Sequence, residues 1–253
     1  MNWIGLYTIY RKEMNRAFAI PLQTILSPVI TTALYFVVFG AAIGSQITQI
    51  SGVTYMQFIV PGLIMMALLT NSLGASSSGI YFPKFIGTIY EILSAPLSHL
   101  EIILGYTLAA TTRALIIGSL IYVVALVFTP IPIAHPAYAI FFAFLTAFTF
   151  AFFGLIIGIW SDTFEKLSLF PALIITPLAF LGGVFYPISV LPPLWQTLSL
   201  INPVVYMISG LRWSFFGTAD IDPHISLTLI SIFLLLCIGA LFMIFKTGYK
   251  IRD

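Results

Sequence analysis

Charged residues are scarce in this chain of 253 residues. Aspartate, glutamate, lysine and arginine make up 7% of it, whereas a soluble domain carries about 25%. Hydrophobic residues make up 60%, and the mean hydropathy is +1.09. This composition excludes an ordinary soluble domain and predicts a membrane protein with several spans.

Cysteine and catalytic motifs are also lacking. Cys237 is the sole cysteine, so no disulfide forms within one chain. No lysine follows a glycine, which excludes a P-loop, and no Gly-x-Ser-x-Gly motif occurs. The histidines, His99, His135 and His224, fall on separate loops, so their spacing excludes a metal cluster. We therefore expect no catalytic residue, no metal and no cofactor bound by this chain, and no nucleic acid among its partners.

Long stretches without a charge mark the membrane spans. They cover residues 17–83, 114–161, 167–211 and 223–245, and one helical span needs about 20 residues. We therefore expect an all-α membrane protein that forms a single domain over residues 1–253. Its six transmembrane helices are expected at residues 22–44, 57–80, 102–128, 137–160, 167–185 and 225–245, with a polar turn at Gln46, Thr48, Gln49 and Ser51 after the first.

The first twenty residues combine helically spaced apolar side chains with charged ones. This pattern predicts an N-terminal amphipathic interfacial helix over residues 1–20. A secretory signal peptide is the alternative, but the first ten residues lack its basic start. Cationic residues orient the spans because they gather on the cytoplasmic side. We expect both termini to be cytoplasmic, together with Arg11, Lys12, Arg16, Lys84, Lys166, Lys246, Lys250 and Arg252.

A polar island at residues 84–106 separates the second span from the third and reads KFIGTIYEILSAPLSHLEIILGY. It holds two pairs with capping-box spacing, in which Ser or Thr precedes Glu by three residues. A proline between the pairs ends the first helix. We expect a short cytoplasmic helix within residues 84–100 and a second helix that continues as the third span. The pairs are Thr88 with Glu91 and Ser98 with Glu101, and the proline is Pro96.

A proline-rich segment between the fifth and sixth spans is too apolar for a solvated loop and too short to cross. It predicts an outer re-entrant helical hairpin at residues 187–216, because irregular backbone is tolerated at membrane depth where protein satisfies it. A pair of interfacial helices lying flat is the alternative. Arg212 is expected near the outer surface.

Polar residues inside the spans are functional candidates because each is costly in lipid. Arg113 is expected to snorkel toward the cytoplasm or to pair with Glu101 or Glu13; a role in conformational change is the alternative. A polar run in the second span either lines a pathway or lets helices pack, and Thr176 with Pro177 marks a kink in the fifth. The pathway or packing candidates are Asn71, Ser72, Ser76, Thr176 and Pro177, and the pairs Gly40 with Gly44 and Gly154 with Gly158 are expected to pack helices within the chain.

The island and the outer segment carry a resemblance to a known family. The island resembles the segment after the second span in permease subunits of type 2 (ABC-2) ATP-binding-cassette exporters, where a glycine-threonine, a glutamate and a proline recur in this order. The outer stretch FLGGVFYPISVLPPLWQTLSLINPVVYMISGLRW is similar to the family's second signature. The similarity extends over the whole chain and looks like that of the Yad-type inner-membrane permeases.

The resemblance implies a half-transporter in the bacterial inner membrane. The chain would pair with a second copy of itself and with two copies of a separate P-loop ATPase, which binds ATP and Mg, and would work by alternating access among membrane lipids. A short helix would couple the chain to the ATPase, although Ile89 and Tyr90 stand where relatives often carry more polar residues. The implied coupling residues are Gly87, Thr88, Glu91, Ala95 and Pro96, and those of the hairpin are Pro187, Pro193, Asn202, Pro203 and Arg212.

An apolar pathway with a few hydroxyls and amides favours an amphipathic or lipid-like substrate. The alternatives are a secondary transporter or a channel-like multi-pass protein that works without ATP, and an intramembrane enzyme. A secondary transporter usually has charged groups near the midplane, which Arg113 alone approaches. An enzyme would need the nucleophile or metal motifs that are missing.

Overall fold

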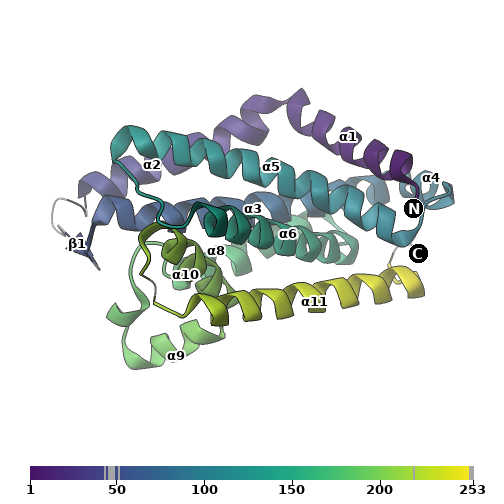
Figure 1. Ribbon diagram of the computed structural model, residues 1–253. Helices are drawn as coiled ribbons and strands as arrows, with labels where there is room; N and C mark the ends of the chain where they lie inside the picture. The colour runs from purple at the N-terminus through teal and green to yellow at the C-terminus, as the bar shows by residue number, and fades with distance from the viewer. Residues whose placement is uncertain (43, 45–48, 51, 219, 251–253) are drawn as a thin grey trace.

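The computed structural model describes residues 1–42, 44, 49, 50, 52–218 and 220–250. The chain is almost entirely helical (Figure 1). Within these described residues, six helical segments are long and apolar enough to cross a membrane, which confirms the all-α fold expected from the charge-free stretches. They are the π-helical turn Leu22–Leu26 continued by α2, Ser27–Ala42; α3, Tyr55–Phe85; α5, His99–Phe128; α6, Pro136–Trp160; α7, Phe164–Phe170, continued by the π-helical turn Pro171–Ile175 and α8, Thr176–Leu181; and α11, Pro223–Thr247.

The bundle has two distinct ends (Figure 1). The start of α1, Trp3–Ala19, the end of α11 and the short helix α4, Ile89–Ser94, share the termini end. The opposite, strand end carries the antiparallel strands β1, Gln49–Ile50, and β2, Val53–Thr54, and the exposed helix α9, Pro193–Ile201. Of the expected polar turn, Gln49 opens β1, whereas Gln46, Thr48 and Ser51 lie outside the described residues, as does Arg252.

Helices α3 and α6 form the centre of the bundle and approach each other closely at two glycines. A Cβ atom on Gly154 would lie 2.5 Å from the carbonyl oxygen of Leu73, and one on Gly158 would lie closer still to that of Ser77. Gly154 and Gly158 therefore pack helices within the chain, as expected. Of the most apolar stretch of α3, 78% is buried inside the chain, against 22% for the α2 segment and 17% for α7–α8.

Helix α1 packs along α5 and reaches α3 through Arg16, which donates to the hydroxyl of Ser78 at 3.3 Å. Gly105 of α5 makes room for it, because a Cβ there would lie 2.9 Å from that of Ile9. One face of α1 buries Leu6, Ile9 and Ala17, while the other exposes Trp3 and Ile4. The amphipathic pattern thus corresponds to one face packed on the bundle, and the place of α1 at a membrane interface stays a prediction.

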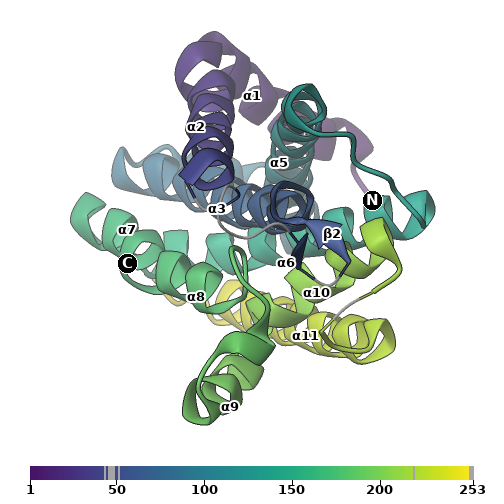
Figure 2. The ribbon, with the colours of Figure 1, turned by 90° about the vertical axis from the view of Figure 1, so that its left-hand side faces the viewer.

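The expected hairpin consists of one exposed and one buried helix. Helix α10, Pro203–Phe216, is buried against α3, α6 and α11, whereas α9 exposes Leu194 and Ile201 (Figure 2). Asn202 joins the two, because its side chain caps α10 by accepting from the amide of Val204 and donates to the carbonyl of Leu178 at 2.6 Å. The depth of this hairpin in the membrane stays a prediction.

Arg212 is buried inside the protein, and its expected place near the outer surface of the membrane stays a prediction. It is only 4% exposed. Its Nη1 lies 3.1 Å from Oδ2 of Asp220, its Nη2 donates to the carbonyl of Gly183 at 2.7 Å, and its guanidinium lies 3.9 Å from the centroid of Phe58. These three partners compensate the cost of burying the charge. Arg212 therefore fastens α10 to α3 and to the loop after α8.

Candidate transport site and coupling surface

A polar cleft of about 360 Å³ lies between the α2 segment, α3 and α5. Most of its polar groups belong to the α2 segment, where they recur about every fourth residue and therefore share one helix face. Helix α3 adds Thr70 and Asn71, and α5 adds Arg113. Its polar lining residues are Gln23, Ser27, Thr31, Thr32, Tyr35, Thr70, Asn71 and Arg113.

Of the five pathway or packing candidates from the sequence, Asn71 alone lines this cleft. Ser76 is buried and donates to the carbonyl of Ala151 at 2.6 Å, so it serves packing between α3 and α6. Ser72 is also buried and donates to Leu68 of its own helix. Thr176 and Pro177 open α8 directly after a π-helical turn, and the hydroxyl of Thr176 donates to Pro171.

Arg113 lies close to a cluster of charges contributed by α1. Its Nη2 donates to the carbonyl of Thr24 at 3.2 Å, and its Nε is buried with no hydrogen-bond partner among the described residues. Glu13 interacts with it electrostatically, but its carboxylate pairs with Arg16 at 2.8 Å and lies 3.8 Å from Lys12. Burial raises the pKa of Glu13, and these cations oppose that rise.

Glu101 is not the partner of Arg113 that the sequence suggested. Its carboxylate accepts from the backbone amide of Ser98 at 2.7 Å and from that of Asn2. Residues 101 and 113 lie on one helix, roughly 18 Å apart at 1.5 Å per residue, so neither side chain can reach the other. The expected pairing with Glu13 is electrostatic rather than a direct ion pair.

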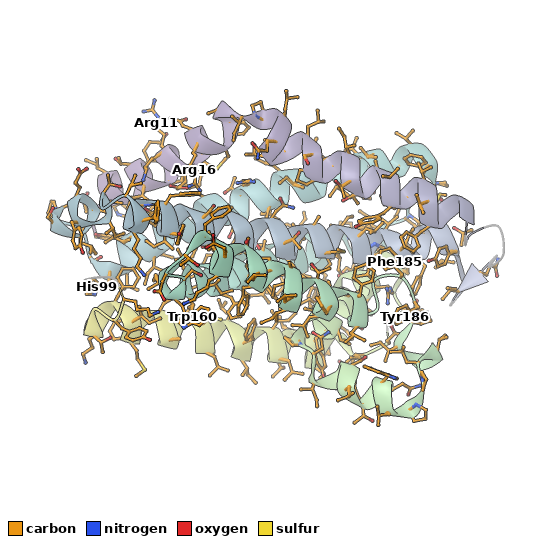
Figure 3. All side chains as sticks on the ribbon, turned by 180° about the vertical axis from the view of Figure 1, so that it is seen from behind. Arg11, Arg16, His99, Trp160, Phe185 and Tyr186 are labelled. Atoms are coloured by element: carbon orange, nitrogen blue, oxygen red, sulfur yellow. The ribbon has the colours of Figure 1, made fainter. Side chains whose placement is uncertain are left out.

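Aromatic rings pack together beside the cleft, toward its strand end. Tyr35 lines the cleft and meets Phe185 edge to face, with ring centroids 6.1 Å apart. One turn further along α2, Phe39 stacks on Phe185 at 4.2 Å, and Phe180 lies 5.2 Å from the same ring. Phe185 lies toward the strand end, whereas Arg16 lies toward the termini end (Figure 3). We call Tyr35, Phe39, Phe180 and Phe185 the aromatic cluster.

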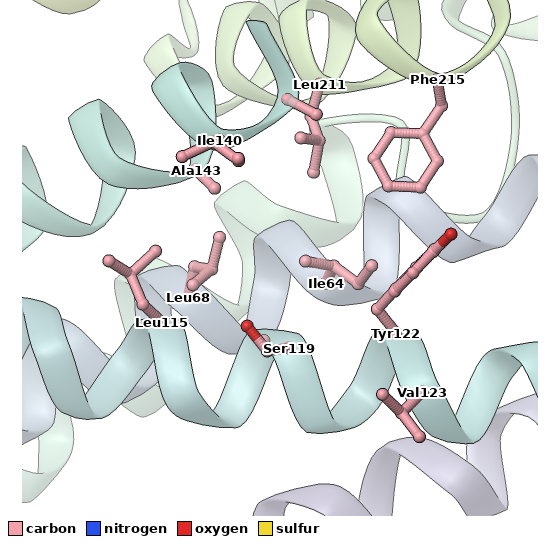
Figure 4. A pocket seen from close by; sticks show the side chains of 12 residues that line it. Ile64, Leu68, Leu115, Ser119, Tyr122, Val123, Ile140, Ala143, Leu211 and Phe215 are labelled. Atoms are coloured by element: carbon pink, nitrogen blue, oxygen red, sulfur yellow. The ribbon is translucent and has the colours of Figure 1, made fainter. Parts of the chain in front are cut away.

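A second cavity, also of about 360 Å³, lies between α3, α5, α6 and α10 (Figure 4). Ile64, Leu68, Leu211 and other apolar side chains line it, and its side-chain hydroxyls are those of Ser119 and Tyr122. With no charged or amide side chain in its lining, this cavity suits hydrocarbon and offers little to fix a polar group. The polar cleft is therefore the better candidate for substrate recognition.

The short helix α4 stands where the sequence places the coupling helix, and it ends before Pro96. Its expected capping box is wrong, because Thr88 makes no capping hydrogen bond. Thr88 has φ −71° and ψ −5°, whereas a capping residue adopts extended angles. Gly87, with φ +82°, supplies the left-handed turn that leads into α4. The second box is confirmed, since Ser98 and Glu101 exchange both bonds.

Asn2 fastens the start of α1 to the segment between α4 and α5. Its side chain accepts from the amide of Gly5 and donates to the carbonyl of Pro96, and its backbone amide donates to Glu101. Beside this joint lies a groove of about 480 Å³ between α1 and α4, which includes Glu91, Ala95 and Pro96. Three of the five proposed coupling residues therefore line one groove at the termini end.

Asp162 forms ion pairs with three lysines at the termini end. Its carboxylate lies 2.8 Å from Nζ of Lys250, 3.1 Å from that of Lys166 and 4.0 Å from that of Lys84. The hydrogen bonds from Lys250 and Lys166 lower the pKa of Asp162 to about 2. The end of α11, the end of α3 and the turn between α6 and α7 thus meet at one side chain.

Sequence reasoning missed three features of this site. It did not find the aromatic cluster, the lysines around Asp162, or the polar face of the α2 segment. The four-residue spacing of Gln23, Ser27, Thr31 and Tyr35 on that face is nevertheless visible in the sequence. That spacing is the signal that a search of helix faces would have used. The other two features depend on contacts between distant segments.

Comparison with known proteins identifies the family. Residues 5–216 match the model of the ABC-2 type transporter family. Inner membrane transport permease YadH of Escherichia coli (strain K12) is 43% identical over 221 residues, which cover 87% of this chain and 86% of that protein. Nodulation protein J of Rhizobium meliloti (strain 1021) is 26% identical over 212 residues, covering 83% and 80%. The chain therefore belongs to the ABC-2 type transporter family, as one of its membrane permeases.

Proposed function

We propose that this chain is the membrane-spanning half of an ATP-driven exporter in the bacterial inner membrane. Two copies of the chain pair with two copies of a separate P-loop ATPase, which binds ATP and Mg. The chain hydrolyses nothing. Nucleotide binding at the partner moves α4, and this movement alternately opens the polar cleft to either side for an amphipathic substrate.

The joint between α1, α4 and α5 is the observation that carries this proposal. Helix α4 is short, and Tyr90 is 51% exposed on it. Through Asn2, Pro96 and Glu101 the same segment is hydrogen-bonded to the start of α1 and to the first turn of α5. A force applied to α4 therefore reaches a long helix that contributes Arg113 to the cleft.

A second copy is supported by two poorly covered helical segments, one of which lines the cleft. The α2 segment exposes Leu26, Ile30 and Leu34, and α7–α8 with its π-helical turn exposes Leu169 and Leu173. Both belong to the least buried spans of the chain. Pairing of two such faces would place two polar clefts around one pathway.

The orientation rests on the distribution of positive charge. Lys84, Lys166 and Lys250 meet at Asp162 on the termini end, and Lys246 lies in the last turn of α11. Cytoplasmic loops carry such an excess of lysine and arginine. This excess supports a cytoplasmic location of both termini, where a soluble ATPase could reach α4. The name of the Escherichia coli relative supports the inner membrane as the location.

Co-expression with the P-loop ATPase encoded nearest to this chain tests the proposal. We expect the two to co-purify, the isolated chain to show no ATP hydrolysis, and Glu91→Lys to abolish substrate-stimulated hydrolysis in the complex. Glu165→Lys, a charge reversal at the start of α7, is the matched control and should keep it. ATP hydrolysis by the isolated chain, or equal effects of the two reversals, would contradict the proposal.

A further inference from the structure

Arg113 is the charged residue in the lining of the polar cleft, and it belongs to a charge cluster with α1 in which cations outnumber carboxylates. Within the described residues Lys12, Arg16 and Arg113 face a single carboxylate, that of Glu13. Glu13 is engaged at 2.8 Å with Arg16, which also donates to Ser78 of α3 at 3.3 Å. Arg113 is left with one hydrogen bond, to a backbone carbonyl.

The guanidinium of Arg113 therefore has unused capacity. Its five N–H groups form a planar fork that matches a carboxylate or a phosphate, and its Nε is buried without a partner among the described residues. A charge at such a position in a membrane protein is costly unless an opposite charge or several dipoles compensate it. An anion in the cleft would supply that compensation.

The other polar groups of the cleft can complete the coordination of such an anion. The side chains of Gln23, Ser27 and Tyr35 make no hydrogen bond in the described part of the chain, so their donors are available. Asn71 uses one amide hydrogen on the carbonyl of Ala67, 2.9 Å away, which holds its side chain in place. Donors from α2, α3 and α5 thus surround one space.

Apolar surface continues beside the polar face. On α2 the residues next to Ser27, Thr31 and Tyr35 form a stripe at the same fourfold spacing, Leu26, Ile30 and Leu34, with exposed fractions of 44%, 58% and 59%. An acidic group bound at Arg113 would therefore have hydrocarbon surface next to it. This combination fits a molecule with one charged head and an apolar tail.

We infer that the cleft is a binding site for the head of an anionic amphiphile, with a phosphate or carboxylate held by Arg113 and positioned by Asn71 and Gln23. This inference rests on the proposed function and names the class of its substrate. Export would carry the charged head past the aromatic cluster while the tail stays against α2.

Lipid binding to the purified chain in zwitterionic nanodiscs tests this inference without the ATPase, so its outcome is separate from that of the coupling experiment. The probe is a pyrene-labelled phosphatidic acid, compared with pyrene-labelled phosphatidylcholine of the same chain length. We expect phosphatidic acid to bind at least about tenfold more tightly, a difference of about 1.4 kcal/mol. Arg113→Gln should remove this preference, and Arg113→Lys should keep part of it.

Arg11→Gln is the matched control because Arg11 is an exposed cation of α1 away from the cleft (Figure 3). It should bind phosphatidic acid as the unmodified chain does. Thr31→Val and Asn71→Leu, which keep every charge, should each weaken binding severalfold and provide the answer if Arg113→Gln fails to fold. Loss of binding in Arg11→Gln as large as in Arg113→Gln would overturn the inference, as would unchanged binding in the three cleft variants.

Inorganic phosphate distinguishes a lipid head from a free anion. We expect millimolar phosphate to displace little of the labelled lipid, because the tail contributes to affinity through buried hydrocarbon. Displacement by phosphate at concentrations equal to those of the lipid would show that the tail adds nothing, and the amphiphile would be the wrong class.

Discussion

The ring of Phe185, in the loop after α8, stacks on the ring of Phe39 in α2, with centroids 4.2 Å apart and planes inclined by 25°. The contact joins two of the least buried helical segments at the strand end of the polar cleft. Aromatic pairs of this kind contribute about 0.5–1.5 kcal/mol beyond the area they bury. Contacts of this strength could open and reform, as the proposed export requires.

We expect Phe185→Ala to open the cleft toward the strand end. A cysteine replacing Thr31, an exposed cleft residue, in a Cys237→Ala background would report this. In sealed vesicles with the strand end outward, a membrane-impermeant thiol reagent should label the cysteine several times faster when Phe185 is Ala. Phe242→Ala, which removes an exposed ring from α11, should leave the rate unchanged. Equal rates in all three backgrounds would mean that the aromatic cluster does not close the cleft.

Close packing between α3 and α6 predicts that added methyl groups are costly there. Gly154→Ala and Gly158→Ala should each lower the free energy of unfolding by about 1–3 kcal/mol, because the backbone of α3 has to move away. Gly239→Ala on α11, where nothing lies within 4 Å of the added atom, is the control. Cys237 is 3% exposed, so its reaction with a thiol-reactive dye during heating reports unfolding. A similar loss in all three variants would contradict the close approach.

The two capping pairs of the island should respond differently to the same substitution. Ser98→Ala removes a formed capping box and should cost about 0.5–2 kcal/mol. Thr88→Ala removes a side chain that makes no capping bond, so the free energy of unfolding should change little. Thermal unfolding monitored at Cys237 compares the two. A larger loss in Thr88→Ala would show that α4 is capped after all.

The ion pairs of Asp162 predict that the stability of the protein falls at acid pH and does not change near neutral pH. Its folded-state pKa of about 2 lies below the ordinary value of 3.8. Its stabilising effect is therefore complete above about pH 4 and is lost as the pH falls through about 2. Lys166 and Lys250 lie over the ring of Trp160, at 5.8 and 5.7 Å, so Trp160 fluorescence reports the cluster once the other tryptophans are Phe.

Asp162→Asn should abolish the low-pH change in Trp160 emission and give an altered spectrum already at neutral pH. Glu165→Gln, which removes a nearby carboxylate with no ion pair among the described residues, should keep the transition. A transition centred near pH 4 in the unmodified chain would mean that the lysines do not hold the carboxylate.

Local chemistry predicted part of this structure well. Charge-free stretches gave the six helices because a chain in lipid must bury its backbone in helices. Spacing identified the box of Ser98 and Glu101, yet the same spacing failed at Thr88, where the turn at Gly87 sets helical backbone angles. A third capping box, between Thr54 and Gln57 at the start of α3, was not predicted from the sequence.

Features that depend on distant segments could not be read from the sequence. The burial of Arg212 depends on its contacts with Asp220, Gly183 and Phe58, which come from separate segments. Asp162 resembles a helix-start residue, and nothing in the order of residues brings Lys84 and Lys250 to it. The cleft likewise exists because α2 lies beside α3 and α5, an arrangement decided by packing.

The close pairing of α3 and α6 makes these two helices the best candidates for the rigid part of the bundle. Because the backbone of α3 lies against Gly154 and Gly158 of α6, the two helices have little room to slide past each other. By contrast, α2 and α7–α8 keep few neighbours inside the chain and contain a π-helical turn each, where the regular ladder of backbone bonds is already broken. In the proposed export, movement that starts at the termini end would therefore bend the α2 segment and α7–α8 relative to α3 and α6.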